Sequence, residues 1–330
     1  MKKILIIQIL LLLIMSNITE AQLTANLGGQ RAGISTAQFL KIGVGGRATA
    51  MGDAFIAVAD DASALYWNPA GLVQGKTNEN QVIFSHNEWV IDIKHEFAGV
   101  VYHFSDNDAI GVSFTSLHME DMPVTTEFNP FGTGEYFSVG DLAFGLSYSK
   151  KLTSQFSFGA TFKYMESTLD RLKMRGVMVD LGTYYWTGLG TSRFAVTVTN
   201  FGNQLAPDGE VVLWGNRKKS DWQEFSPPTM FRIGFALEPY MTDEHRVTTS
   251  IQLNHPNDNS ENVSLGAEYS WKEIFYLRSG YRFNADSKDY TFGAGLKVPA
   301  GIANVTVDYS YSNLMDLGSA HRFSILLGLY

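Results

Sequence analysis

The chain offers few groups whose spacing suits catalysis. Residues 43–48 read Gly-Val-Gly-Gly-Arg-Ala and formally match the G-x-G-x-x-A pattern of dinucleotide-binding loops. That pattern needs a strand before it and a helix after it in a parallel βαβ unit, and the surrounding sequence predicts neither. Cysteine is absent, and the seven histidines are scattered without metal-ligand spacing. We therefore expect no catalytic residue, no cofactor and no metal site.

A second group of residues is suited to binding a partner. The segment 202–228 contains two tryptophans and three neighbouring cations, which are Trp214, Trp222, Arg217, Lys218 and Lys219. Aromatic side chains beside arginine are typical of the energetic centre of a protein interface. Cations in such a segment also bind the phosphates of lipopolysaccharide. The sequence leaves both interpretations of this loop open.

Composition limits the class of protein. The formal net charge of the 330 residues is -8, which argues against a nucleic-acid partner. The chain combines 31 glycines with a 13 % aromatic share. That mixture favours many short strands over helices.

The N-terminus predicts export. Lys2 and Lys3 precede an apolar run from Ile4 to Met15, and small residues follow, ending at Ala21. This order is typical of a signal peptide, and the run is shorter than the roughly 20 residues of a spanning helix. We expect residues 1–21 to be removed; an uncleaved N-terminal anchor is the alternative.

From residue 80 to residue 330 the chain alternates between apolar and polar residues. Phe158 and Phe162 share one face, for example, while Thr161 and Lys163 share the other. Charges of both signs recur on the polar face, at Asp141, Lys163, Asp180, Arg232, Glu268, Arg278, Arg282, Lys297, Asp308 and Arg322. Segments of roughly ten alternating residues predict a transmembrane β-barrel whose charges line a polar lumen. A soluble β-sandwich is the competing interpretation.

Turn residues divide this region into 14 predicted strands. We expect them near 80–90, 92–104, 109–118, 137–149, 154–166, 175–186, 192–201, 229–238, 245–255, 261–271, 274–284, 289–299, 303–312 and 320–330. Short turns belong on the periplasmic side of such barrels and long loops outside. The last strand ends on Tyr330, and it resembles the terminal aromatic signal of bacterial outer-membrane barrels. The predicted location is therefore the bacterial outer membrane.

One block before the strands is specific. Residues 39–72 read FLKIGVGGRATAMGDAFIAVADDASALYWNPAGL. This block resembles the N-terminal motif of the PorV/PorQ family of outer-membrane proteins, which is related to the FadL fatty-acid transporters. The positions that carry the motif are Gly43, Gly45, Arg47, Met51, Gly52, Asp60, Asp61, Asn68, Pro69 and Ala70.

The resemblance implies an all-β, 14-stranded antiparallel barrel with its N-terminal segment inside as a plug. The domains would then be a signal peptide at 1–21, a plug or hatch at 22–76 and a barrel at 77–330. Asn68-Pro69-Ala70 matches the hatch element of FadL-type barrels, and it is either a gate or a turn that joins the plug to the first strand. Asp60 and Asp61 are placed to cap a short helix through Leu65.

Inward-facing glycines on the strands would give the plug room. They are Gly145, Gly159, Gly182, Gly234, Gly266, Gly280, Gly293 and Gly295.

Two functions follow from the resemblance. One is a docking or shuttle component of type IX secretion, with secretion-system subunits or exported cargo as partners. The alternative is a FadL-like transporter that takes a hydrophobic ligand across the outer membrane. Both place the chain in outer-membrane lipid, and neither is an enzyme. An outer-membrane hydrolase with a Ser-His pair at the barrel rim is a third possibility that no motif supports.

Overall fold

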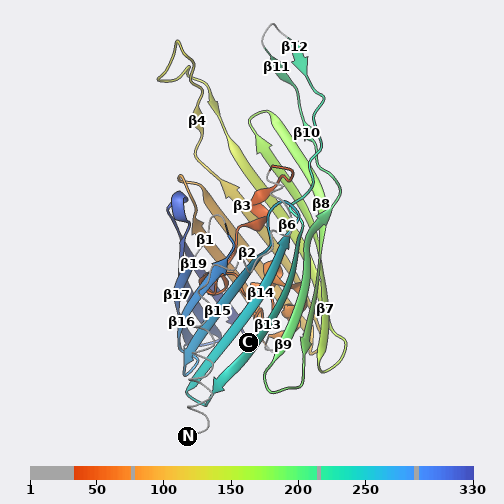
Figure 1. The fold of residues 1–330 in the computed structure, drawn as a ribbon, viewed down its shortest axis with the longest axis vertical. Helices are drawn as coiled ribbons and strands as arrows, with labels where there is room; N and C mark the ends of the chain where they lie inside the picture. The colour runs from red at the N-terminus through yellow and green to blue at the C-terminus, as the bar shows by residue number, and fades with distance from the viewer. Residues whose placement is uncertain (1–32, 76–78, 214–216, 286–289) are drawn as a thin grey trace, which may run out of the picture.

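The computed structural model describes residues 33–75, 79–213, 217–285 and 290–330. These residues form an antiparallel barrel of 14 long strands around residues 33–75 (Figure 1). The predicted fold class is confirmed. The long strands are β1 (Asn80–Glu88), β2 (Lys94–Ser105), β3 (Asp108–His118), β6 (Val139–Lys151), β7 (Phe156–Leu169), β8 (Leu172–Trp186), β9 (Arg193–Gly202), β13 (Met230–Met241), β14 (His245–Pro256), β15 (Asn262–Trp271), β16 (Phe275–Phe283), β17 (Tyr290–Ala300), β18 (Ala303–Asn313) and β19 (Ser319–Leu329).

The barrel closes between its first and last strands. β1 pairs with β19 from Asn80, opposite Leu329, to Glu88, opposite His321. β9 sits between β8 and β13 and completes the circle on the other side. Each long strand therefore has a hydrogen-bonded neighbour on both sides, which a sheet surrounded by lipid requires. The predicted strand boundaries agree with the observed ones to within three residues.

The two ends of the barrel differ in the length of their links. Short turns such as 106–107 and 242–244 lie at one end, which we call the inner end. The opposite end, which we call the outer end, has the long links that rise at the top of Figure 1. These links contain four of the short strands: β4 (Met122–Pro123), β5 (Tyr136–Phe137), β11 (Val211–Leu213) and β12 (Arg217–Lys219). Short turns face the periplasm in barrels of this class.

The two faces of the wall follow the predicted alternation. Phe158, Phe162 and Leu181 point outward and are between 39 % and 54 % exposed. Thr161 and Asp180, on the opposite face, have no exposed surface. The apolar residues thus meet lipid, and the ten predicted lumen charges lie on the inner face.

Residues 33–75, which we call the plug, have little regular structure. Their helices are η1 (Gln38–Lys41), α2 (Gly46–Ala50), α3 (Ala64–Trp67) and η2 (Pro69–Gln74). Gly45, with φ of +80°, precedes α2, and Pro69 begins η2. None of the helices within the described ranges is long and apolar enough to cross a membrane.

Candidate functional site

The plug is packed as tightly as a protein core. Phe55, Ile56, Leu65 and Trp67 are each 2 % exposed or less. The Tyr66 and Trp67 rings meet edge to face with centroids 5.0 Å apart. Burial of this many apolar groups inside the wall holds the plug in the lumen.

Glycines in the wall make room for the plug backbone. A Cβ atom on Gly280 would lie 2.1 Å from the backbone nitrogen of Gly52, and one on Gly159 would lie 2.3 Å from the carbonyl carbon of Pro69. Gly182, Gly234, Gly266 and Gly293 approach the plug in the same way. The other two predicted glycines have different neighbours.

Gly145 and Gly295 are the exceptions, because they face other side chains of the barrel. A Cβ atom on Gly145 would meet Ser113, and one on Gly295 would meet Asp308 and Arg278. The expectation that these two glycines make room for the plug was wrong, since period-two alternation gives a residue's face but not its neighbour across the lumen.

Asn68-Pro69-Ala70 lies where the plug touches β8. The Asn68 Oδ1 atom accepts the Ala70 N–H at 3.1 Å, and its Nδ2 group donates to the Ile56 carbonyl at 2.9 Å and to the Thr183 carbonyl at 3.2 Å. The tripeptide is therefore the capped start of η2, and it is hydrogen-bonded to the plug and to the wall at the same time.

An ionic cluster ties the plug to the wall near the inner end. Arg47 contacts Asp60 at 2.6 Å, Asp61 at 2.8 Å and Glu268 of β15 at 3.1 Å. Glu268 also binds Arg278 of β16 at 2.6 Å. Both partners of Glu268 are arginines, whose planar guanidinium groups can donate two parallel hydrogen bonds to a carboxylate.

This cluster corrects one prediction. Neither Asp60 nor Asp61 caps α3, which begins at Ala64 after Ser63 and has no side-chain cap. Asp61 does accept the Ser63 N–H at 2.8 Å, but Ser63 precedes the helix. Both carboxylates instead face Arg47.

The remaining motif positions serve packing within the plug and against the barrel wall. A Cβ atom on Gly43 would lie 2.9 Å from Thr49, and Met51 has no exposed surface. Gly52 has a φ of +65° and approaches the β16 backbone at Tyr281. Such contacts favour glycine on steric grounds alone.

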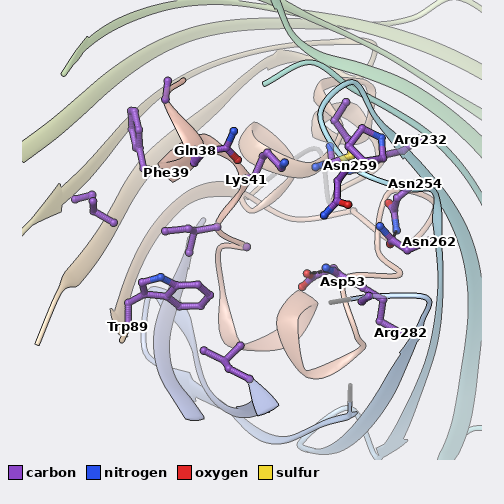
Figure 2. A pocket seen from close by; sticks show the side chains of 18 of the residues that line it. Gln38, Phe39, Lys41, Asp53, Trp89, Arg232, Asn254, Asn259, Asn262 and Arg282 are labelled. Carbon is purple, nitrogen blue, oxygen red and sulfur yellow. Dashed lines mark hydrogen bonds and ion pairs between the residues drawn. The ribbon is translucent and has the colours of Figure 1, made fainter. Parts of the chain in front are cut away.

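Above the plug lies an open cavity of about 640 Å³ at the outer end, which we call the outer cavity. Figure 2 shows Trp89 on one side of it and Arg232, Asn254 and Asn262 on the other. Asp53 and Arg282 also line the cavity and contact each other (Figure 2). The sequence predicted the lumen charges of this cavity but not their grouping with Trp89.

The first residues of the plug are tied to two links of the outer end. Lys41 binds Asp258, in the link after β14, at 2.7 Å. The Thr36 N–H donates to the Ser226 carbonyl at 3.1 Å. The plug and the loop at 202–228 are therefore in direct contact.

The structure places part of the predicted partner loop. The Lys219 Nζ atom lies 5.0 Å from the centre of the Trp222 ring, and the Trp222 indole donates to the Gly209 carbonyl at 2.9 Å. Lys218 pairs with Glu210 at 2.7 Å. Arg217 begins β12, whereas Trp214 lies outside the described residues, as do residues 1–32 of the leader and early plug.

Another outer-end loop was not singled out from the sequence. Phe128 and Phe131, between β4 and β5, are 93 % and 100 % exposed. Two aromatic residues near Pro130 and Gly132 were the only signal that could have pointed to this tip.

Comparisons with known proteins give a family and a fold. A family model described as "Type IX secretion system protein PorV" matches residues 26–256. No curated protein sequence matches the chain. Similar solved structures include the CymD monoaromatic hydrocarbon channel, with 14 % identity over 87 % of this chain and 97 % of that chain and a TM-score of 0.57.

Two further structures have the same fold. The Ralstonia pickettii toluene transporter TbuX has 13 % identity over 87 % of this chain and 97 % of that chain, with a TM-score of 0.56. A Pseudomonas aeruginosa FadL homologue has 12 % identity over 89 % of this chain and 98 % of that chain, with a TM-score of 0.57. At these identities the likeness concerns the fold.

Proposed function

Since this chain belongs to the family of the type IX secretion system protein PorV, we propose that it is a docking or shuttle component of protein export. The chain is an outer-membrane barrel. Its family and fold are those of secretion and transport barrels and not of an enzyme family. Its chief partners would be secretion-system subunits or exported cargo, and outer-membrane lipid would surround it.

The observation that supports docking beyond the family is the closed lumen. The plug bonds to the wall at the outer end through Lys41 and at the inner end through Gln74, whose Oε1 atom accepts the Trp186 indole N–H at 2.9 Å. A lumen closed by a plug that is bonded near both ends suits binding at the outer end better than conduction. We also propose the boundaries that the sequence predicts, which are 1–21 for the leader, 22–76 for the plug and 77–330 for the barrel.

The docking surface that we propose is the tip of the 202–228 loop, with Trp214, Arg217, Lys218, Lys219 and Trp222. Its base must be kept in any test, because Leu205 is 1 % exposed and pairs with Phe225 through two 2.8 Å backbone hydrogen bonds. Removing the whole loop would therefore disturb the barrel as well as the tip.

Affinity purification from the native outer membrane tests this proposal. One variant has a short Gly-Ser turn in place of residues 210–221, and the control has the same turn in place of residues 126–132 at the other exposed tip. Mass spectrometry should find secretion subunits or exported proteins with the wild type and the control, and few with the first variant. Equal recovery from all three would contradict a docking role for this loop.

Hydrophobic transport is the second candidate function. The outer cavity has apolar side chains, such as Phe39, Ile42, Leu117 and Leu314, beside its charges. Predominantly apolar clefts of 300–1,000 Å³ commonly bind small molecules. A stoichiometric hydrophobic compound in the same purification, with no protein partner, would favour this function over docking.

A further inference from the structure

The base of the 202–228 loop is closed on itself and seated on the wall. The Leu205 and Phe225 backbones exchange two hydrogen bonds of 2.8 Å. Leu205 is 1 % exposed, and a Cβ atom on Gly176 of β8 would lie 2.0 Å from its side chain. Just beyond this pair, β10 (Pro207–Asp208) runs antiparallel to β8. The wall therefore fixes the place where the loop rises from the barrel.

Asn200 of β9 anchors the end of the same loop. It has a left-handed backbone, with φ of +58°, and lies where the register between β8 and β9 shifts. Its side-chain amide donates to the Pro228 carbonyl at 3.3 Å, and its own carbonyl accepts the Thr229 hydroxyl at 3.1 Å. Its N–H donates to Asp180 at 2.8 Å, and its Oδ1 atom accepts from Lys163 at 3.0 Å. Two bonds thus reach the loop and two reach the wall.

The plug also contacts this base directly. In an isolated parallel bridge, the Thr36 N–H donates to the Ser226 carbonyl at 3.1 Å, and the Ser226 N–H donates to the Ile34 carbonyl at 3.3 Å. Ser226 follows Phe225, which bonds to Leu205. These two adjacent residues are therefore the middle one of three short backbone segments, and the plug forms one edge.

The helix η1 adds side-chain contacts to the backbone bridge. Phe39 and Leu40 are 3 % and 4 % exposed, and they share a hydrophobic cluster with Leu205 of the loop base. On the same helix, Gln38 donates to Asp258 at 2.6 Å. Because Asp258 lies in the link after β14, the plug ties the loop base to a second link of the outer end.

We propose that plug residues 34–40 position the 202–228 loop for docking, an inference that rests on the docking role proposed above. Long links tend to vary in conformation, and ordering such a link upon binding costs free energy. A loop that is already held in place binds without most of this cost. The plug then has a second role besides filling the lumen, because it keeps the docking surface in one orientation.

Distances between two spin labels test this inference without any partner. The chain has no cysteine, so Gln223→Cys in the loop and His118→Cys at the end of β3 introduce the only two labelling sites. Both side chains are exposed. Electron–electron double resonance on the intact protein in detergent should give one narrow distance distribution, because the loop base is bonded to both the wall and the plug.

Two variants remove the contact with the plug. Thr36→Pro lacks the N–H that donates to Ser226, and deletion of residues 24–36 removes both backbone partners of Ser226. Each should broaden the distribution at least twofold, and the deletion remains informative where the proline variant does not fold. The control is Gln74→Ala, which removes the plug's bond to Trp186 at the inner end. It should leave the distribution unchanged, because Gln74 does not contact the loop.

The affinity purification described above then shows whether this position matters for docking. We expect the plug variants to recover at most a third as much partner protein as the wild type and the Gln74 variant. A distribution that is already broad in the intact protein, or unchanged in the folded plug variants, would overturn the inference, as would full recovery of partners despite a broadened distribution. Absence of partners from the wild type would contradict the docking role itself, whereas the distances still decide whether the plug positions the loop.

Discussion

Asn68 of the plug and Gly182 of β8 are in such close contact that a Cβ atom on Gly182 would lie 2.1 Å from the Asn68 Oδ1 atom. No side chain fits at this point of the wall unless the Asn68-Pro69-Ala70 segment moves. This contact connects two parts of the chain that the sequence distinguishes. One is the plug, which is rich in small residues, and the other is a strand with inward-facing glycines.

The first prediction concerns this contact. Gly182→Ala should destabilise the protein by about 1–3 kcal/mol, because the added methyl group overpacks the lumen. Urea unfolding in detergent measures the change. The control is Gly140→Ala on β6, where the nearest atom to the new Cβ is 3.7 Å away. Equal stability of the two variants would show that the plug does not press on Gly182.

The second prediction concerns Arg47. Arg47→Gln should cost about 3 kcal/mol of unfolding free energy, because it leaves Asp61 and Glu268 with less compensation in a buried site. The matched change Arg246→Gln removes an exposed pair with Glu273, which is 2.9 Å long. That change should cost less than about 1 kcal/mol. Similar losses of unfolding free energy in both variants would show that the Arg47 cluster stabilises the protein no more than an exposed ion pair does.

The third prediction is a pH dependence at the outer end. Burial alone raises the pKa of Asp258, but hydrogen bonds from Lys41 and Gln38 outweigh burial and hold its pKa below the ordinary value. A lowered pKa in the folded state contributes stability above the carboxyl's unfolded pKa of about 3.9, and this stability is lost as pH falls through the folded value.

Hydrogen exchange of residues 34–41 measures this effect at pH 7 and in acid well below the ordinary carboxyl pKa of about 3.9. Protection in the wild type should exceed that in Asp258→Asn at pH 7, and the difference should disappear in acid. A difference that persists unchanged in acid would contradict the assignment to Asp258.

The fourth prediction is a plugged pore. The intact protein should show little single-channel conductance in planar bilayers, because the plug is bonded at both ends of the lumen. Deletion of residues 22–76 should raise the conductance if the barrel survives. A large, steady conductance from the intact chain would be incompatible with a filled lumen.

The strands and their faces could be predicted from the sequence because both are local properties. Alternation over ten residues placed Phe162 toward lipid and Lys163 toward the lumen, as the structure confirms. The even strand count followed from turn residues. The plug, by contrast, followed from the resemblance of residues 39–72 to a known family, since its short helices have no periodicity.

The partners of the lumen charges could not be predicted, because the contacts are far apart in the sequence. Arg47 and Glu268 are 221 positions apart, and Lys41 and Asp258 are 217 apart. Asp60 and Asp61 were therefore assigned to a neighbouring helix instead of Arg47. The outer cavity was missed for the same reason, since plug, strands and links all contribute to it.

An export assay in the native bacterium tests whether this barrel serves protein export. Cells that lack the chain are complemented with the wild type, with the variant shortened at 210–221, or with the control shortened at 126–132. The fraction of exported proteins held in the periplasm is then measured. We expect retention without the chain and with the first variant, and normal export with the wild type and the control. Normal export in cells that lack the chain, together with reduced uptake of hydrophobic compounds, would contradict the docking role and support transport.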